Sequence, residues 1–161
     1  MPDRPDAARL AAWRAFLTAH AALTEALEAE LRAERDLSLP WYDVLVQLSE
    51  APAGAMRMQD LARSTLLSKS GLTRLVDRME QAGLVERRPC PDDQRGRLAV
   101  LTTAGRAALR RAAPVHLRGV EEHFARHLTD AEVALLHAAL GNVLAALGRP
   151  AMPNEPAEPS S

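Results

Sequence analysis

A long stretch of the sequence, from Ala7 to about Arg35, contains neither glycine nor proline and is dominated by alanine, leucine, glutamate and arginine. These residues favour helix formation, so the stretch predicts one α-helix that extends over about 40 Å. Its apolar side chains recur every three or four residues and therefore lie along one side of the helix. They are Leu10, Trp13, Leu17, Leu23, Leu27 and Leu31.

Two more long helices are predicted near the other end of the sequence. Thr102 or Thr103 caps a helix over about 103–127, in which Pro114 predicts a kink near residues 110–114. A capping box at Thr129 and Glu132 opens a helix over about 130–147. Because the apolar stripes at both ends are long, we expect a second copy of the chain to cover them. The alternative is that they pack only on each other.

Shorter helices are predicted in between. Pro40 suits the first turn of a helix that runs to about Glu50, and residues 51–54 form a loop. Two further helices follow over residues 58–64 and 69–82, and Ser68 is a good N-cap for the second. Its apolar positions, at spacings of three and four, predict one buried face: Leu72, Leu75, Val76 and Met79.

The period of the pattern then changes to two. Residues 84–88 and 98–101 are the only convincing strands, and residues 89–97 join them as a hairpin with a polar, basic tip. At this tip Arg95 and Arg97 flank Gly96, a residue that tolerates a tight turn.

The net charge of −1 hides a basic middle segment. Residues 57–111 carry a net charge of +6, whereas residues 1–56 carry −4 and residues 112–161 carry −3. A local basic patch steers a polyanion whatever the total charge. Two helices joined by a short turn and followed by a basic hairpin therefore favour a helix-turn-helix with a wing, which binds DNA. The alternative is a solvated helix face.

Composition excludes several other classes. With one cysteine, Cys90, the chain can form no internal disulfide and no cysteine-based zinc knuckle. No run of 18 apolar residues predicts a membrane helix, and the N-terminus lacks the apolar core of a signal peptide, so we expect a cytoplasmic protein. Without a motif for nucleophilic, metal-dependent or nucleotide-dependent catalysis, we expect no enzyme and no cofactor.

The segment from Leu72 to Arg106 resembles the signature of the MarR family of bacterial transcription regulators. The family pattern has T-R-x-x-D-R in the recognition helix, then G-L-V-x-R, then D-x-R-G at the wing and L-T-x-x-G after it. The matching residues are Thr73, Arg74, Asp77, Arg78, Met79, Gly83, Leu84, Val85, Arg87, Asp93, Arg95, Gly96, Leu101, Thr102 and Gly105. Met58 stands where the family has a serine or threonine, and Arg97 adds a charge after the wing glycine.

The resemblance implies a mainly α fold, with a winged helix-turn-helix core and long N- and C-terminal dimerisation helices. The expected parts are residues 1–39 for dimerisation, 40–102 for DNA binding, 103–148 for dimerisation and 149–161 as a disordered tail. The partners it implies are a double-stranded, pseudo-palindromic DNA operator, a second copy of the chain and a small-molecule effector. Asp93 would orient the wing through an ion pair. The candidate DNA-binding residues are Ser68, Lys69, Ser70, Thr73, Arg74, Arg78, Arg87, Arg95 and Arg97.

The resemblance also implies a ligand cleft where the dimerisation helices meet the winged helix. Four of the five aromatic residues and one histidine fall in the first two helices: Trp13, Phe16, His20, Trp41 and Tyr42. They would form a wall for an aromatic or phenolic anion that releases a repressor from DNA. The alternative is that they are core residues.

Two other functional classes remain open. His123 and His127 are four residues apart, beside Glu122, so a helix would place them on one face and a metal-responsive regulator is an alternative. We expect no metal, however, because the second helix offers no further ligand, and we expect Cys90 to be an inert surface residue. A protein-interaction module that has lost its ligand response is the other alternative.

Overall fold

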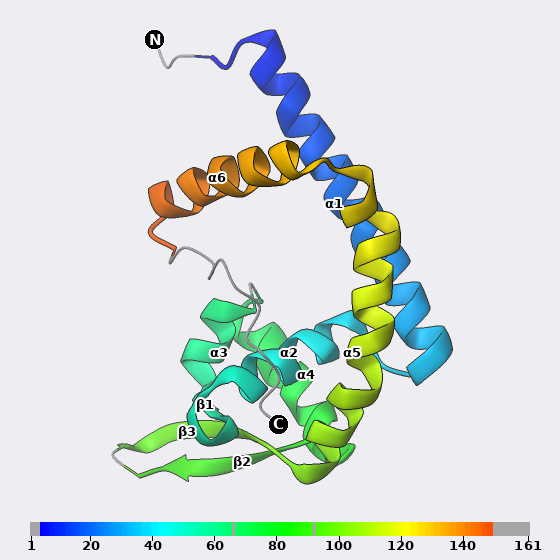
Figure 1. Cartoon of the computed structure of the whole chain (residues 1–161). Helices are drawn as coiled ribbons and strands as arrows, with labels where there is room; N and C mark the ends of the chain where they lie inside the picture. The colour runs from blue at the N-terminus through cyan, green and yellow to red at the C-terminus, as the bar shows by residue number, and fades with distance from the viewer. Residues whose placement is uncertain (1–3, 66, 92, 150–161) are drawn as a thin grey trace. The chain divides into compact units, whose positions relative to one another are not determined.

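The computed structural model describes residues 4–65, 67–91 and 93–149 of the 161-residue chain. It is mainly α-helical with one small sheet (Figure 1). The chain divides into two compact units, Met1–Val120 and Glu121–Ser161. The helices are α1 (Ala7–Arg35), α2 (Leu39–Glu50), α3 (Met58–Ser64), α4 (Lys69–Gln81), α5 (Thr103–His123) and α6 (Asp130–Ala146). The predicted mainly α fold class is confirmed.

Helix α1 is the long helix that the sequence predicts. The Asp6 side chain accepts a hydrogen bond from the Arg9 backbone N–H (2.8 Å), and the helix ends where Asp36 takes a left-handed conformation at φ 52°. Its apolar stripe has two different surroundings. Leu31 is fully buried, whereas Trp13 is 55% exposed in the single chain. Only the C-terminal part of α1 therefore belongs to the core of its own chain.

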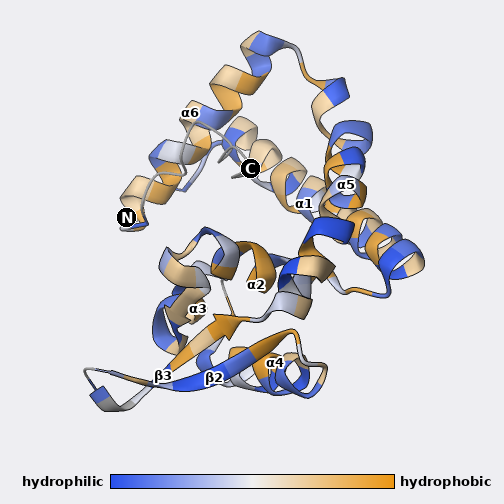
Figure 2. Ribbon diagram, turned by 60° about the horizontal axis from the view of Figure 1, so that its bottom comes forward, coloured by the Kyte–Doolittle hydropathy of each residue, from blue (hydrophilic) through white to orange (hydrophobic). Residues whose placement is uncertain are grey.

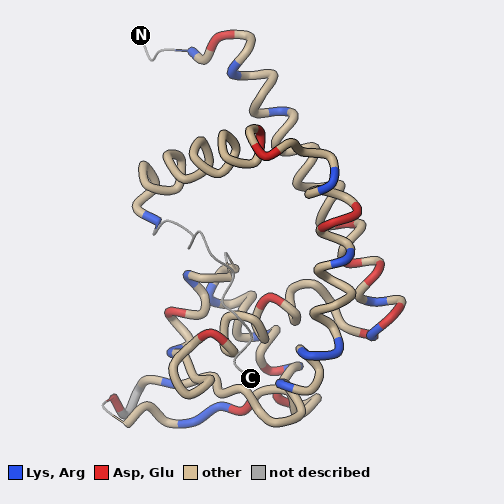
Figure 3. Tube along the Cα trace, viewed as in Figure 1, with Lys and Arg blue, Asp and Glu red and all other residues tan. Residues whose placement is uncertain are grey.

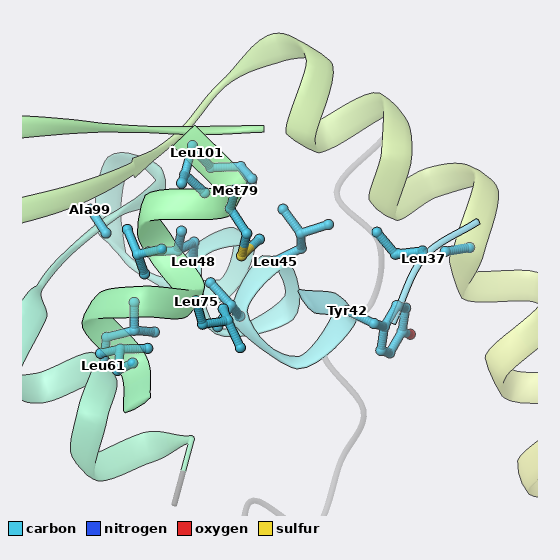
Figure 4. Close-up of a cluster of buried hydrophobic side chains, with 14 of the residues drawn as sticks. Leu37, Tyr42, Leu45, Leu48, Leu61, Leu75, Met79, Ala99 and Leu101 are labelled. Atoms are coloured by element: carbon cyan, nitrogen blue, oxygen red, sulfur yellow. The ribbon is translucent and has the colours of Figure 1, made fainter. Parts of the chain in front are cut away.

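The core forms between α2, α4 and the sheet. Leu45 and Leu48 of α2 are completely buried together with Met79 of α4, and Leu75 is almost so. Figure 4 shows these side chains pointing toward one another. Burying each such side chain stabilises the fold by about 1.5–3 kcal/mol. The predicted buried face of α4 is confirmed.

The sheet has three strands, in the order β1-β3-β2, and all pairs are antiparallel. They are β1 (Ala55–Arg57), β2 (Val85–Cys90) and β3 (Asp93–Leu101). The sequence analysis missed β1, because three residues are too few to show a period and its pairing with β3 bridges over 40 residues of chain. It also made the hairpin strands too short, since β2 continues to Cys90 and β3 begins at Asp93, with Pro89 opposite Arg97 and Cys90 opposite Asp93 on the two sides of an irregularity.

Helix α5 begins against the hairpin. The Thr102 hydroxyl donates to the Gly83 carbonyl (2.7 Å) and accepts from the Gly105 N–H (3.0 Å). The α-helix continues through Pro114 and ends at His123, four residues before the predicted end. Phe124 then leaves the helical conformation (φ −130°, ψ −65°), and His127 lies in a 3-10 turn at Ala125–His127. The prediction that His123 and His127 share one α-helical face is therefore wrong.

The second unit contains α6, and its predicted capping box is confirmed. The Thr129 N–H donates to the Glu132 carboxylate (2.8 Å), and the Thr129 hydroxyl accepts from the Glu132 N–H (3.3 Å). No residue of α6 is buried in the single chain, although the helix is rich in leucine and alanine. Figure 2 shows apolar segments recurring along this helix.

The expected division into residues 1–39, 40–102 and 103–148 stays a prediction. The tail predicted over 149–161 lies, except for Arg149, outside the described residues. Among the described helices, none alone has the length and apolar composition to cross a bilayer. Only the bent pair Thr103–His127 and Asp130–Ala146, taken together, meets that criterion.

A pH-dependent contact joins α2 to α5. The Tyr42 and His116 rings lie 4.4 Å apart between centroids, and burial lowers the pKa of His116 below its ordinary value of 6.5. The unfolded chain therefore takes up a proton that the folded chain resists, and stability should fall as the pH drops below about 6.5 through the lowered pKa.

We expect His116→Gln to flatten the pH dependence of unfolding in this range. Urea unfolding at about pH 7.5 and about pH 5 measures it. The same exchange at the exposed His20 is the control and should keep the wild-type slope. A wild-type slope in the His116 variant would contradict the assignment.

Candidate nucleic-acid interface

Helix α4 is fixed in orientation by its two ends and by its buried face. The Ser68 hydroxyl caps it by accepting a hydrogen bond from the Gly71 N–H (3.1 Å). Its C-terminal end is followed by Gly83 in a left-handed conformation (φ 73°). The buried face packs on α2, so the opposite side of α4 faces solvent. Ser68 therefore serves the helix itself, and its hydroxyl lies 3.4 Å from that of Ser70.

The solvent side of α4 carries free cations. Lys69, Ser70, Thr73, Arg74 and Arg78 are all exposed. Among the described residues, no ion pair involves Lys69, Arg74, Arg78 or Arg97. A guanidinium without a carboxylate partner retains all of its donors for an external ligand, and planar phosphate contacts suit it. These four side chains are therefore available to a polyanion.

Arg87 differs from the other candidate residues. Its guanidinium forms an ion pair with Asp77 of α4, lies 3.9 Å from Glu80 and donates to the Thr73 carbonyl (3.4 Å). The Glu80 carboxylate also accepts from the Arg87 backbone N–H (2.9 Å). Arg87 therefore joins strand β2 to the recognition helix, and this geometry favours a positioning role over a direct contact with a ligand.

The hairpin of β2 and β3 forms the wing. Asp93 lies 3.7 Å from Arg57, which stands at the end of β1, so the ion pair reaches across the sheet. A Cβ on Gly96 would lie 3.0 Å from the Asp93 carboxylate and 3.1 Å from the Cys90 Cβ, so any other residue here would require these side chains to shift. The backbone of Arg95 lies in β3, but its side chain is outside the described residues.

A basic hollow of about 320 Å³ lies between α3, α4 and the wing. Arg57, Lys69, Arg87 and Arg97 line it, together with Thr73 and the single carboxylate of Asp93. Figure 3 shows the basic segments along β2 and at the base of the wing. The structure thus brings together residues from four separate sequence segments. Sequence analysis missed Arg57, because an isolated arginine before a short helix carries no pattern.

Arg78 lies on the other flank of α4. It lines a second, larger cavity of about 1020 Å³ with residues of α1 and α2. Leu75 and Ala82, one turn to either side of Arg78, line the same cavity. One flank of the recognition helix therefore borders the basic hollow, and the other borders this second cavity.

The five predicted ligand-binding side chains have three different surroundings. Trp13, Phe16 and His20 follow one another on the exposed half of α1, at ring distances of 6.1 and 6.3 Å. Trp41 lines the second cavity. Tyr42 is buried against His116, so it is a core residue. Their shared role as one ligand wall stays a prediction.

The remaining candidate residues, Cys90 and the two histidines, contact other parts of the chain. Cys90 is buried at the wing, so the expectation of a surface residue is wrong: it is the last residue of β2 and pairs with Asp93 of β3. The His127 ring lies 3.0 Å from the Glu122 carbonyl. Within the part of the chain that the structure describes, no three histidine, cysteine or acidic side chains are grouped so as to hold a metal ion.

Comparison with known proteins gives one consistent result. Residues 35–96 match the model of the MarR family. The chain is 35% identical over 85 residues to the multiple antibiotic resistance protein MarR of Escherichia coli (strain K12), which covers 53% of this chain. That match spans 59% of the relative, less than two thirds of its length.

Two solved structures from Streptomyces coelicolor match over nearly the whole chain. AbsC, a MarR family transcriptional regulator, has a TM-score of 0.83 at 38% identity and covers 91% of this chain and 98% of its own. Sco3205, a MarR family transcriptional regulator solved in complex with DNA, has a TM-score of 0.83 at 31% identity and covers 96% of both chains. These matches confirm the winged helix fold that the sequence predicts.

The ion pair between Asp77 and Arg87 should contribute measurably to stability, because it is partly buried and shares partners with Glu80. In a double-mutant cycle of Asp77→Ala and Arg87→Ala we expect a coupling energy of about 1 kcal/mol by urea unfolding. The control cycle, Glu86→Ala with Arg88→Ala, removes a more exposed pair on the same strand and should give under about 0.5 kcal/mol. Equal coupling in both cycles would show that Arg87 does not position α4.

Proposed function

Because this chain belongs to the MarR family of transcriptional regulators, we propose that it binds duplex DNA as a homodimer and represses the genes next to its operator. One observation carries the proposal: α4 is anchored by its buried face, while Lys69, Arg74 and Arg78 on its exposed face form no ion pair with any carboxylate that the structure describes. AbsC and Sco3205, which share this fold, are MarR family transcriptional regulators.

In the proposed complex, α4 enters the major groove. Ser70, Thr73 and Arg74 lie on the side of the helix that faces away from the core, where donors reach base edges and phosphates. Lys69 and Arg78 flank them. Arg95 and Arg97 belong to the wing, which reaches the adjacent minor groove, where narrow A·T tracts concentrate negative potential. A two-fold dimer then reads a pseudo-palindromic operator with half-sites about 10 base pairs apart.

The dimer is inferred from apolar surface that the single chain leaves open. Trp13, Phe16 and Leu17 of α1 are 44–55% exposed, and Leu135 of α6 and Leu147 at its C-cap are 71% exposed. Large apolar side chains that gather on an exposed helix face are typical of protein–protein contacts. We infer that a second copy of the chain covers this surface. In a two-fold dimer both subunits contribute the same surface, so one exposed apolar face per chain is sufficient.

An effector that releases the repressor would act at the second cavity. Leu75, Arg78 and Ala82 of α4 form part of its lining, so a bound molecule contacts the helix that reads the DNA. A metal-responsive regulator has less support, because His123 and His127 do not share an α-helical face. The other alternative is a protein-interaction module. It has less support, because it does not explain why α4 presents cations that form no ion pair among the described residues.

The test of the function is DNA binding by an Arg74 variant. An operator is first selected from random duplexes, and its affinity for wild type and Arg74→Ala is measured by fluorescence anisotropy at several salt concentrations. Loss of one phosphate contact should lower the slope of log affinity against log salt by about 0.9. Loss of a base contact should relax specificity at one position by about 1–3 kcal/mol instead.

Arg110→Ala is the matched control, since Arg110 is also exposed but lies on α5. It should leave affinity and salt slope unchanged. If Arg74→Ala also changes neither quantity, or if no duplex is enriched by selection, the proposed function is wrong.

The dimer has its own test. Wild-type chain should sediment at about twice 17.5 kDa at low micromolar concentration. Leu135→Glu should shift the equilibrium toward monomer by at least tenfold in Kd, because it puts a charge into the proposed interface. His137→Glu places the same charge on another exposed position of α6 and separates the effect of the site from the effect of charge. A monomeric wild type would contradict the proposal.

A further inference from the structure

The second cavity has an unusual distribution of charge for a site next to a DNA-binding helix. Its wall is formed by the second half of α1, the start of α2 and the C-terminal half of α4. Four carboxylates contribute to it against two arginines, so the lining has a net charge of −2. At about 1020 Å³ it is large enough for a drug-sized molecule.

Contacts within the protein account for only part of this charge. The Glu28 carboxylate accepts from Arg32 Nε (2.7 Å) and from the Leu39 backbone N–H, so it is already satisfied. The other three carboxylates, Glu25, Asp36 and Asp43, have no ion pair among the described residues. The helices that carry these carboxylates fix their backbone positions. Asp36 ends α1, and Asp43 lies in the second turn of α2.

The same cavity also has apolar and aromatic lining. Trp41 lines the cavity, and its backbone N–H donates to the Ser38 hydroxyl that caps α2 (3.3 Å), so the start of the helix fixes the residue. Leu39 and Leu75 add aliphatic surface from α2 and α4. An indole with carboxylates near it is suited to a cation, because the ring face attracts positive charge and the carboxylates neutralise it.

The side chains of Glu25, Asp36 and Asp43 are exposed to solvent, and burial raises the pKa of Asp43 above its ordinary value. A ligand cation is therefore attracted by carboxylates at the rim of the cavity, and this attraction weakens as salt is added. An aromatic anion, in contrast, would meet a wall of the same sign.

We propose that this cavity binds an organic cation with an aromatic or aliphatic body, which is attracted by the carboxylates of Glu25, Asp36 and Asp43 and packs against Trp41. This ligand class replaces the phenolic anion that the aromatic residues alone suggested. The proposal rests on the proposed function only for its regulatory consequence, namely that the ligand lies beside Arg78 of the recognition helix. Binding of the cation itself requires no DNA.

The test uses three probes that share one scaffold and differ in charge: 4-tert-butylbenzylamine, 4-tert-butylbenzyl alcohol and 4-tert-butylbenzoate. The chain has two tryptophans, so a Trp13→Phe background leaves Trp41 as the only one. Binding is followed by Trp41 fluorescence and by calorimetry near pH 7.5, where the amine is charged. We expect the amine to bind at least tenfold more tightly than the alcohol and the benzoate.

Removal of the charge should remove this preference. The double variant Glu25→Gln with Asp43→Asn should bring the affinity of the amine to within about threefold of that of the alcohol. Glu86→Gln changes a carboxylate on the wing, far along the chain from the cavity lining, and should leave the preference intact. Thermal melting of each variant shows whether it is folded, and Gln and Asn retain the size of the side chains they replace.

Equal or tighter binding of the benzoate, or an amine preference that survives in the folded double variant, would overturn the proposal. Anisotropy with the selected operator, on the same preparations, keeps the two questions separate. A chain that binds the amine but no duplex contradicts the proposed function alone. A chain that binds its operator but not the amine contradicts the cation site alone.

Discussion

The packing of α4 on α2 is the contact on which the functional surface depends. Leu72, Val76 and Met79 are completely buried on one side of α4, so the helix cannot rotate without exposing them to water. Each such exposure costs about 1.5–3 kcal/mol, which is a large part of the stability of a domain this small. The polar side of α4 is therefore presented to solvent in one orientation, and an external polyanion meets a surface that is already formed.

The wing adds a second restraint on the same helix. Arg87 on β2 contacts Asp77 and the Thr73 carbonyl, so the strand and the helix are linked by charge as well as by the core. A helix held on two sides loses little conformational entropy when it binds, and this preorganisation raises affinity without any new contact. Under the proposed function, Arg87 therefore supports DNA binding by positioning α4 and contacts no nucleotide itself.

Much of this arrangement was predictable from the sequence, for local reasons. The bounds of α1 and α4 and the capping box of α6 follow from helix propensity, period and caps within each segment. The errors have non-local causes: β1 forms only because β3 offers an edge, and Cys90 is buried only because β2 continues past Pro89. The sequence analysis grouped five side chains into one ligand-binding wall because they are aromatic or titratable. Which neighbours a side chain contacts depends instead on the side of the helix from which it projects. Trp41 and Tyr42 are adjacent in sequence, yet one lines a cavity and the other is in the core.

The segregation of charge along the chain has a second consequence in the fold. Acidic residues of α1 and α2 line the second cavity, whereas Lys69 of α4 and the arginines of β1 and the wing line the basic hollow. Arg78 is exposed on α4 and also lines the acidic second cavity. Its guanidinium is therefore attracted both by the carboxylates of the cavity and by any phosphate on the solvent side of α4. A cation bound at the proposed site would change the balance between these two attractions. Because coupling between two binding sites is reciprocal, the proposed operator would then alter the affinity of the cavity for that cation by the same factor.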